Sequence, residues 1–333
     1  VSKFPSHLVS AQIRRIEDKE YAYEFLDISR DETGKIKVKD SNKLPISEFP
    51  ISKKTEDKTG CLVVWERPVK DPVYGQYYAS IDPVAEGKTT TSDSLCSIYV
   101  MKAPVEVTKV TVDETETYIE QDKIVAAWCG RFDDIKQTHE RLEMIIEWYN
   151  AQTVIENNIS LFILYMISRK RQRYLVPKNQ IMFLKDLGAN ANVFQEYGWR
   201  NTGVLFKHHL LSYVIEYCKE ELDTVTKPDG TIVRTTYGIE RIPDIMLLKE
   251  MHAYTDGLNV DRLVAFSAMV AFMRIQQANI GYTKRVIMDD ASKNLQKSEN
   301  LFKLNSSPFR HMGGRGTKVN GQYIKRSAFK NFK

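Results

Sequence analysis

The chain of 333 residues lacks the signatures of several common protein classes. No apolar run reaches the roughly 18 residues of a membrane span, so we expect no membrane partner. Six histidines include one adjacent pair but no H-E-x-x-H motif, which argues against a zinc protease. The four cysteines are far apart and form no C-x-x-C pair, which argues against a zinc site or a disulfide framework; they are Cys61, Cys96, Cys129 and Cys218.

Charge is unevenly distributed along the chain. The net charge is +5, but the segment from Lys284 to Lys333 holds 12 Lys or Arg against 3 Asp or Glu, which leaves residues 1–283 at −4. An acidic body with a basic tail suits a protein that binds a polyanion and keeps an acidic pocket. A solvated, disordered tail is the alternative explanation.

The order of sequence patterns predicts three parts. Residues 1–59 combine a short helical pattern with a polar, turn-rich stretch, and we interpret them as the end of an upstream region followed by a linker. The first residue is Val, not Met, which fits a piece of a longer polypeptide. Residues 60–280 carry the ordered domain, and residues 281–333 form a basic, flexible tail.

Short β-branched and aromatic runs dominate the first half of the central part, and amphipathic helices dominate the second half. Strands are expected at 61–65, 77–82, 94–102, 105–112, 123–129 and 153–155, and helices at 135–149, 159–167, 210–222, 243–254 and 261–275. Residues 223–240 predict a hairpin around Pro228-Asp229-Gly230. This order predicts an α/β fold with a mixed sheet flanked by helices.

Three acidic residues stand out by position. Asp82 ends the strand YYASID and is followed by Pro83, which cannot continue a ladder. Glu156 ends another strand in TVIENN, and Asp261 begins an apolar helix, where the helix dipole favours a negative charge. Carboxylates at strand ends and a helix start can converge on one edge of a sheet.

Such a cluster suits phosphodiester hydrolysis with two divalent cations. Carboxylate oxygens are hard ligands for Mg²⁺ or Mn²⁺, and two ions about 3.5–4 Å apart activate water and stabilise the leaving oxygen. Each residue also has an ordinary explanation. Asp82 can be a turn residue, Glu156 a polar strand end and Asp261 a helix cap.

Five motifs occur in an order that resembles the nuclease domain of bacteriophage large terminase subunits, which has a ribonuclease H-like fold. The resemblance covers about residues 60–275. The motifs are Ser80-Ile81-Asp82-Pro83 followed by Asp93, then Val154-Ile155-Glu156-Asn157-Asn158, Gly198–Lys207, Asp244–Glu250 and Asp261–Ala265. One departure is Ile159-Ser160-Leu161, where the family usually has Gly after the Glu-Asn element.

The resemblance implies that Asp82, Glu156 and Asp261 bind two Mg²⁺ or Mn²⁺ ions, with Asp93 as an auxiliary ligand, and cut double-stranded concatemeric viral DNA. Asp244 is a less certain member, Asn157 and Asn158 would fix the loop, and Lys207 would contact a phosphate. The implied partners are an upstream ATPase domain of the same polypeptide, the portal ring and the small terminase subunit, in the host bacterial cytoplasm.

The sequence also contains a cluster of basic residues and one segment that looks like a phosphate loop. Arg169, Lys170, Arg171 and Arg173 could bind the DNA backbone or simply form an exposed helix end. Gly87-Lys88-Thr89 resembles a phosphate loop, but Asp82 stands where that motif requires Gly. The alternatives that we keep are a Holliday-junction resolvase or transposase-like nuclease, and a non-catalytic module that docks on DNA or the portal.

Overall fold

The computed structural model describes residues 3–18, 21–51, 57–87, 93–181, 197–200, 204–228, 230–280, 283–289, 293, 318–319 and 322–323. Contacts divide the chain into two units. The first comprises Val1–Val105 and Glu120–Thr283, and the second Glu106–Ile119 and Lys284–Lys333. Within the described residues, none of the helices combines the length and the apolar character needed to cross a bilayer.

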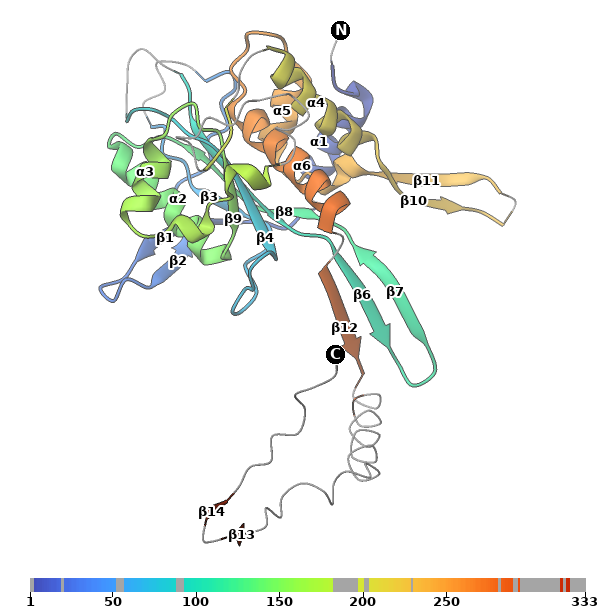
Figure 1. Cartoon of the computed structure of the whole chain (residues 1–333). Helices are drawn as coiled ribbons and strands as arrows, with labels where there is room; N and C mark the ends of the chain where they lie inside the picture. Colours follow the sequence, from blue (N-terminus) through green and yellow to red (C-terminus); the bar gives the residue numbers. More distant parts are fainter. Residues whose placement is uncertain are drawn as a thin grey trace. The chain divides into compact units, whose positions relative to one another are not determined.

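A mixed seven-stranded sheet forms the centre of the first unit, in the order β2-β1-β3-β8-β5-β4-β9 (Figure 1). Only β4 and β9 pair in parallel, and the other neighbours are antiparallel. The strands are β1 (Glu24–Arg30), β2 (Ile36–Asp40), β3 (Leu62–Val64), β4 (Tyr77–Asp82), β5 (Cys96–Lys102), β8 (Lys123–Gly130) and β9 (Gln152–Ile155).

Helices cover both faces of this sheet, which confirms the predicted α/β class of a mixed sheet flanked by helices (Figure 1). The helices α2 and α3 lie on one side, and α4, α5 and α6 lie on the other. Their bounds are α1 (Ser6–Glu17), α2 (Ile135–Tyr149), α3 (Leu161–Ser168), α4 (Val204–Lys219), α5 (Ile245–Ala253) and α6 (Asp261–Ile280), with short 3₁₀ turns at Gln172–Tyr174, Lys178–Gln180 and Gly238–Arg241.

Alternation along the central strands creates two separate cores. Tyr77 and Ile81 of β4 belong to the core beneath α2, whereas Tyr78 belongs to the core beneath α6. Successive side chains of a strand point to opposite faces, so every second residue of β4 faces α6. Asp82 follows Tyr78 by four residues and therefore lies on the α6 face.

Two antiparallel hairpins are not part of the central sheet. The hairpin predicted around Pro228 is confirmed, since β10 (Glu221–Thr226) pairs with β11 (Ile232–Tyr237). In the second unit, β6 (Val105–Val110) lies between β7 (Thr115–Glu120) and β12 (Thr283–Met288) in a three-stranded sheet. A further short pair, Lys318–Val319 and Gln322–Tyr323, is the part of residues 290–333 that forms described strands.

The domain boundary expected at residue 60 is wrong. Strands β1 and β2 belong to the central sheet, and Leu26 and Ile28 are buried in its core. The reason is that β2 is an edge strand whose sequence, IKVKD, keeps its polar residues in solvent and so looks like a linker. The predicted tail begins close to the division at residue 283, but most of it lies outside the described residues.

Candidate metal centre

Parallel pairing of two strands brings Asp82 and Glu156 together. Ile81 and Ile155 are the last register partners of β4 and β9, and the Glu156 N–H donates to the Ile81 carbonyl at 3.0 Å. Asp82 and Glu156 are therefore the next residues on two adjacent strands, at the same edge of the sheet. Glu156 is buried, with 5% of its surface exposed, and Asp82 is partly exposed.

The start of helix α6 supplies the third carboxylate. The Leu95 N–H donates to Asp261 Oδ2 at 2.7 Å, and the Asn259 amide donates to the same oxygen at 3.2 Å. These two bonds fix the side chain beside the segment that leads into β5. Helix α6 also packs against β4 and β5.

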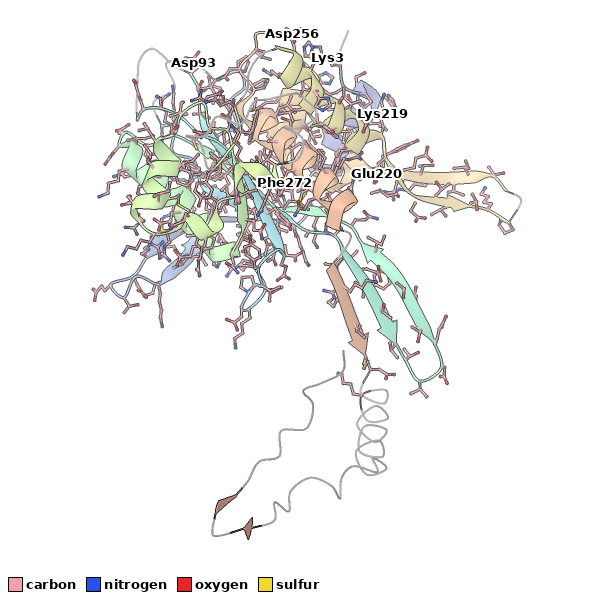
Figure 2. All side chains as sticks on the ribbon, in the orientation of Figure 1. Lys3, Asp93, Lys219, Glu220, Asp256 and Phe272 are labelled. Atoms are coloured by element: carbon pink, nitrogen blue, oxygen red, sulfur yellow. The ribbon has the colours of Figure 1, made fainter. Side chains whose placement is uncertain are left out.

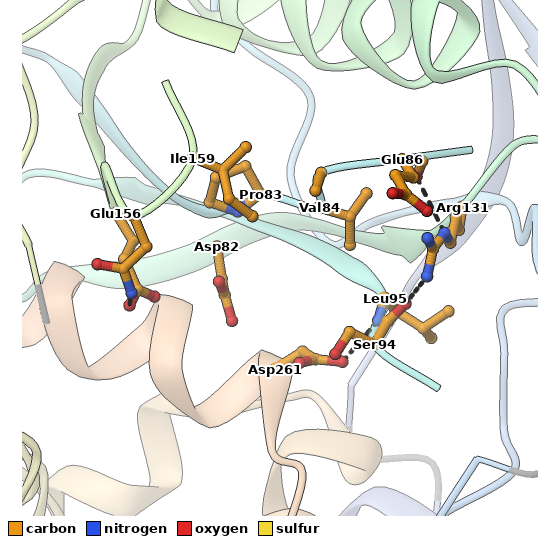
Figure 3. A pocket seen from close by; sticks show the side chains of 12 residues that line it. Asp82, Pro83, Val84, Glu86, Ser94, Leu95, Arg131, Glu156, Ile159 and Asp261 are labelled. Carbon is orange, nitrogen blue, oxygen red and sulfur yellow. Dashed lines mark hydrogen bonds between the residues drawn. The ribbon is translucent and has the colours of Figure 1, made fainter. Parts of the chain in front are cut away.

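One cleft of about 420 Å³ is lined by all three carboxylates. Figure 3 shows Asp82 between Glu156 on one side and Asp261 on the other, and all three residues line this cleft. Pro83, Val84 and Ile159 form part of the apolar wall. The structure therefore brings together the three residues that the sequence predicted as a triad.

Burial raises the proton affinity of the carboxylates in the cleft, and their mutual repulsion adds to the effect. Burial raises the pKa of Asp82 well above its ordinary value, and the charges of Glu156 and Asp261 and a hydrogen bond with Glu156 add to the effect. Burial raises the pKa of Asp261 to about 6, although the bonds from Leu95 and Asn259 oppose the shift. A cation in the cleft would lower both pKa values, because it would balance the negative charge of the neighbouring carboxylates.

The donor set fits a hard divalent cation. Carboxylate oxygens are the preferred ligands of Mg²⁺ and Mn²⁺, and a bound cation would balance the charges of Asp82 and Glu156. Within the described residues, no three His, Cys, Asp or Glu side chains already stand as a compact metal-binding group. The three carboxyls instead lie around one cleft, where a bound cation would balance the charges that raise the pKa of Asp82.

Asp93, the expected auxiliary ligand, is close in sequence to the cleft but is not one of its lining residues. Its neighbours Ser94 and Leu95 line the cleft. Asp93 is half-buried, and its Oδ1 atom has no hydrogen-bond partner among the described residues. An uncompensated buried carboxylate oxygen is unfavourable, which makes Asp93 suitable for an additional cation contact.

The four basic residues predicted to bind DNA differ in their contacts. Arg169 and Arg171 bind the buried carboxylate of Glu143, with nitrogen to oxygen distances of 2.9 and 3.3 Å. Arg173 stacks on the Tyr174 ring at 4.6 Å, and Lys170 is exposed just after helix α3. None of these four basic residues is among those that line the acidic cleft.

Lys207 lies at a different surface cluster. Its ammonium group is 5.5 Å from the centre of the Tyr254 ring, and Lys3 lies over the same ring at 5.2 Å. Lys3 also forms an ion pair with Asp256 at 2.8 Å (Figure 2). His208 hydrogen-bonds to this pair, whereas Lys207 is not among the residues that line the acidic cleft.

Asp244 does not line the cleft, and it has a structural role instead. Its carboxylate accepts from the Met246 N–H at 2.8 Å and so caps helix α5. The Tyr99 hydroxyl donates to its other oxygen at 2.5 Å. N-capping of an apolar helix therefore explains why Asp stands at this position.

Sequence reasoning missed Arg131, which shapes the cleft. Its guanidinium donates to the carbonyl oxygens of Glu86, Gly87 and Ser94, at 3.0, 2.6 and 3.1 Å (Figure 3). These bonds hold the segment after β4 near the segment before β5. No local pattern identifies this role, because the acceptors are backbone atoms about 40 residues away, as the separations of 45, 44 and 37 residues show.

Asn158, which the sequence suggested as a loop-fixing residue, contacts the site directly. Its amide donates to Glu156 Oε1 at 2.5 Å. Asn157 holds the neighbouring segment, because its amide donates to the Tyr197 carbonyl at 2.9 Å. Asn158 therefore holds the Glu156 side chain, and Asn157 holds the segment that follows it.

Comparison with known proteins adds no relative. No protein-family model, curated protein or solved structure matches this chain. The functional conclusion therefore depends on the residues and geometry described above.

Proposed function

We propose that this chain is a metal-dependent endonuclease domain of the ribonuclease H-like type. The observation that supports the proposal is that Asp82, Glu156 and Asp261, from two strand ends and a helix start, line one cleft. Their shared excess of negative charge is what a pair of divalent cations would balance. The motif order further supports a role as the DNA-cutting part of a viral large terminase subunit.

The residues of the cleft would divide the work between binding and positioning. Asp82, Glu156 and Asp261 would hold two Mg²⁺ or Mn²⁺ ions, which supply an activated water and balance the charge that develops on phosphate. Asn158 orients Glu156, and the Leu95 N–H orients Asp261. Arg131 keeps the two loops at the rim in place.

In this proposal the substrate is concatemeric double-stranded DNA in the host bacterial cytoplasm. An upstream ATPase domain, the portal ring and the small terminase subunit would deliver and position it. Basic side chains contact phosphates without reading sequence, which suits a nuclease that must cut at the end of packaging. Lys170 and Arg173 are exposed candidates for such contacts.

Conversion of supercoiled plasmid in Mn²⁺, Mg²⁺ or EDTA tests the proposal. We expect metal-dependent nicking by the wild-type protein and a loss of about 100-fold or more for Asp82→Asn or Glu156→Gln, since even partners outside the ligand set cost about 10–100-fold. Asp113→Asn, an exposed Asp in the β6–β7 turn, is the matched control. Equal cleavage by Asp82→Asn would place the chemistry elsewhere, and no cleavage by the wild type would favour a non-catalytic docking module.

A further inference from the structure

The three-stranded sheet of the second unit has two edges, formed by β7 and β12. Every residue of β7 from Thr115 to Ile119 is exposed, and so are residues 284–287 of β12. Among the strands that the structure describes, none pairs with the outer side of either edge. An exposed edge presents a row of backbone donors and acceptors that can pair with another chain.

The two edges run in opposite directions. Lys284 binds Glu106 at 3.1 Å, and the Asp289 N–H donates to the Val110 carbonyl at 3.3 Å, so β12 is parallel to β6. A tight turn, in which the Thr111 N–H donates to the Glu114 carbonyl at 2.8 Å, makes β7 antiparallel to β6. The arrows in Figure 1 show the same directions. A second copy in the same orientation would therefore present its β12 antiparallel to β7.

Charge on the two edges is complementary. Strand β7 and the turn before it carry Asp113, Glu114, Glu116 and Glu120, with no Lys or Arg between them. Strand β12 carries Lys284 and Arg285 and no acidic residue. Opposite charges across neighbouring strands stabilise pairing, whereas two copies of the same edge would repel each other.

Side-chain faces of the two strands match in one antiparallel register. Thr108 and Thr117 hydrogen-bond at 3.2 Å, and Lys284 contacts Glu106, so Ile119 and Val286 lie on the same face of the sheet. Tyr118 and Ile287 lie on the other face. Pairing Val286 with Ile119 also places Ile287 opposite Tyr118 and Arg285 opposite Glu120. The four apolar residues are 57%, 41%, 40% and 44% exposed in the order Val286, Ile119, Ile287 and Tyr118.

We propose that β12 of one copy pairs with β7 of the next copy and extends the three-stranded sheet from chain to chain. The contact uses two different surfaces of the protein, so repetition closes into a ring or continues as a filament. Backbone hydrogen bonds supply affinity, and the two apolar pairs select the register. This inference does not depend on nuclease activity.

Site-directed disulfide formation tests the register. Chains carrying Tyr118→Cys and chains carrying Ile287→Cys are mixed and oxidised, and we expect a covalent dimer that neither variant gives alone. Thr115→Cys is the matched control, because Thr115 is in the same strand but lies on the opposite face. Of the native cysteines, Cys61, Cys96 and Cys218 are buried, and Cys129 is half-buried, so wild-type protein measures the background.

Sedimentation over a range of concentrations tests the association itself. We expect the wild-type chain to self-associate and Val286→Asp to weaken association by about tenfold, or ~1.4 kcal/mol, with an unchanged circular dichroism spectrum. A wild-type protein that stays monomeric and gives no cross-link above the Thr115→Cys control would overturn the proposal. So would a monomer whose duplex DNA binding is lost in Lys284→Ala/Arg285→Ala, which would make β12 a DNA contact instead. Plasmid cleavage measured in parallel reports separately on the metal centre.

Discussion

Arg262 donates from Nη1 to the Glu250 carboxylate at 3.0 Å, one residue along helix α6 from Asp261. The Leu263 N–H donates to the other Glu250 oxygen at 3.0 Å, and Arg262 Nη2 donates to the Ile46 carbonyl at 2.8 Å. Both charged side chains are almost fully buried, at 4% and 2% exposed. The ion pair therefore fixes the first turn of the helix that presents Asp261 to the cleft.

Removing one member of this pair should destabilise the protein more than removing both. Arg262→Met leaves the Glu250 charge buried without its partner and should cost about 3–5 kcal/mol in the free energy of unfolding. The double variant Arg262→Met/Glu250→Leu replaces the pair with apolar side chains and should recover most of that loss. Urea denaturation measures both, and equal values for the single and double variants would contradict the assigned role.

Stability without metal should fall as the pH rises from about 4 to about 6. The pKa of Asp261 is raised from 3.8 to about 6, so over this range the folded state binds more protons than the unfolded state. The loss should be on the order of 1–3 kcal/mol, and the raised pKa of Asp82 adds in the same direction. Thermal unfolding at several pH values measures it.

Two changes should reduce this pH dependence. Asp261→Asn cannot ionise, so its slope should be shallower than that of the wild type, and Mn²⁺ should raise the stability of the wild type most above pH 6. A wild-type profile that stays flat in EDTA would show that folding does not raise the pKa values of these carboxyls.

The basic cluster should separate into structural and DNA-binding members. Arg171→Ala removes one of the partners of buried Glu143 and should lower the free energy of unfolding by about 1 kcal/mol, since Arg169 remains in contact. Lys170→Ala/Arg173→Ala should leave unfolding nearly unchanged but weaken DNA binding and reduce its dependence on salt. Fluorescence anisotropy with duplex DNA at two salt concentrations distinguishes the two variants. Unchanged DNA affinity in the double variant would remove this surface from the proposed DNA path.

Gly198 should be sensitive to substitution because it approaches the end of β9 closely. It has φ +78°, and a Cβ atom there would lie 2.7 Å from the Ile155 carbonyl oxygen, next to Glu156. Gly198→Ala should cost at least the ~1–2 kcal/mol of the left-handed conformation and should also reduce cleavage. Gly34→Ala is the matched control, with φ +81° and no atom within 4 Å of the added carbon. An equal loss for both variants would mean that only the backbone conformation matters.

The sequence predicted those helices and strands in which apolar residues recur regularly along the whole element. Strand β4 (Tyr77–Asp82) and helix α2 (Ile135–Tyr149) have the bounds expected from the sequence, because their apolar residues all face a core. Strand β7 was missed because TETYIE is exposed on both faces, which leaves no alternation to detect. Phe25 and Leu26 look like a continuation of the preceding apolar helical pattern, but they lie in β1.

The candidate site was predictable to the extent that position in an element determines it. Asp82 and Glu156 are strand ends, and Asp261 is a helix start, so the order of elements was enough to suggest their convergence. Arg131 and the Glu250–Arg262 pair depend on contacts made only after folding. The basic residues near Glu143 could be identified from the sequence, but their roles could not. A dense run of Lys and Arg does not indicate which side chains form ion pairs within the protein.

The bond from Arg262 to the Ile46 carbonyl limits how far the protein can be shortened at its N-terminal end. The polar composition of the preceding segment suggests a fragment that starts at residue 60. Such a fragment would lack β1 and β2, and β3 would become an exposed edge. It would also remove the acceptor of Arg262 Nη2, so a buried guanidinium beside the cleft would lose a partner. Failure of such a fragment to cut DNA would then reflect a damaged scaffold, and the shortest informative fragment must retain residues 24–46.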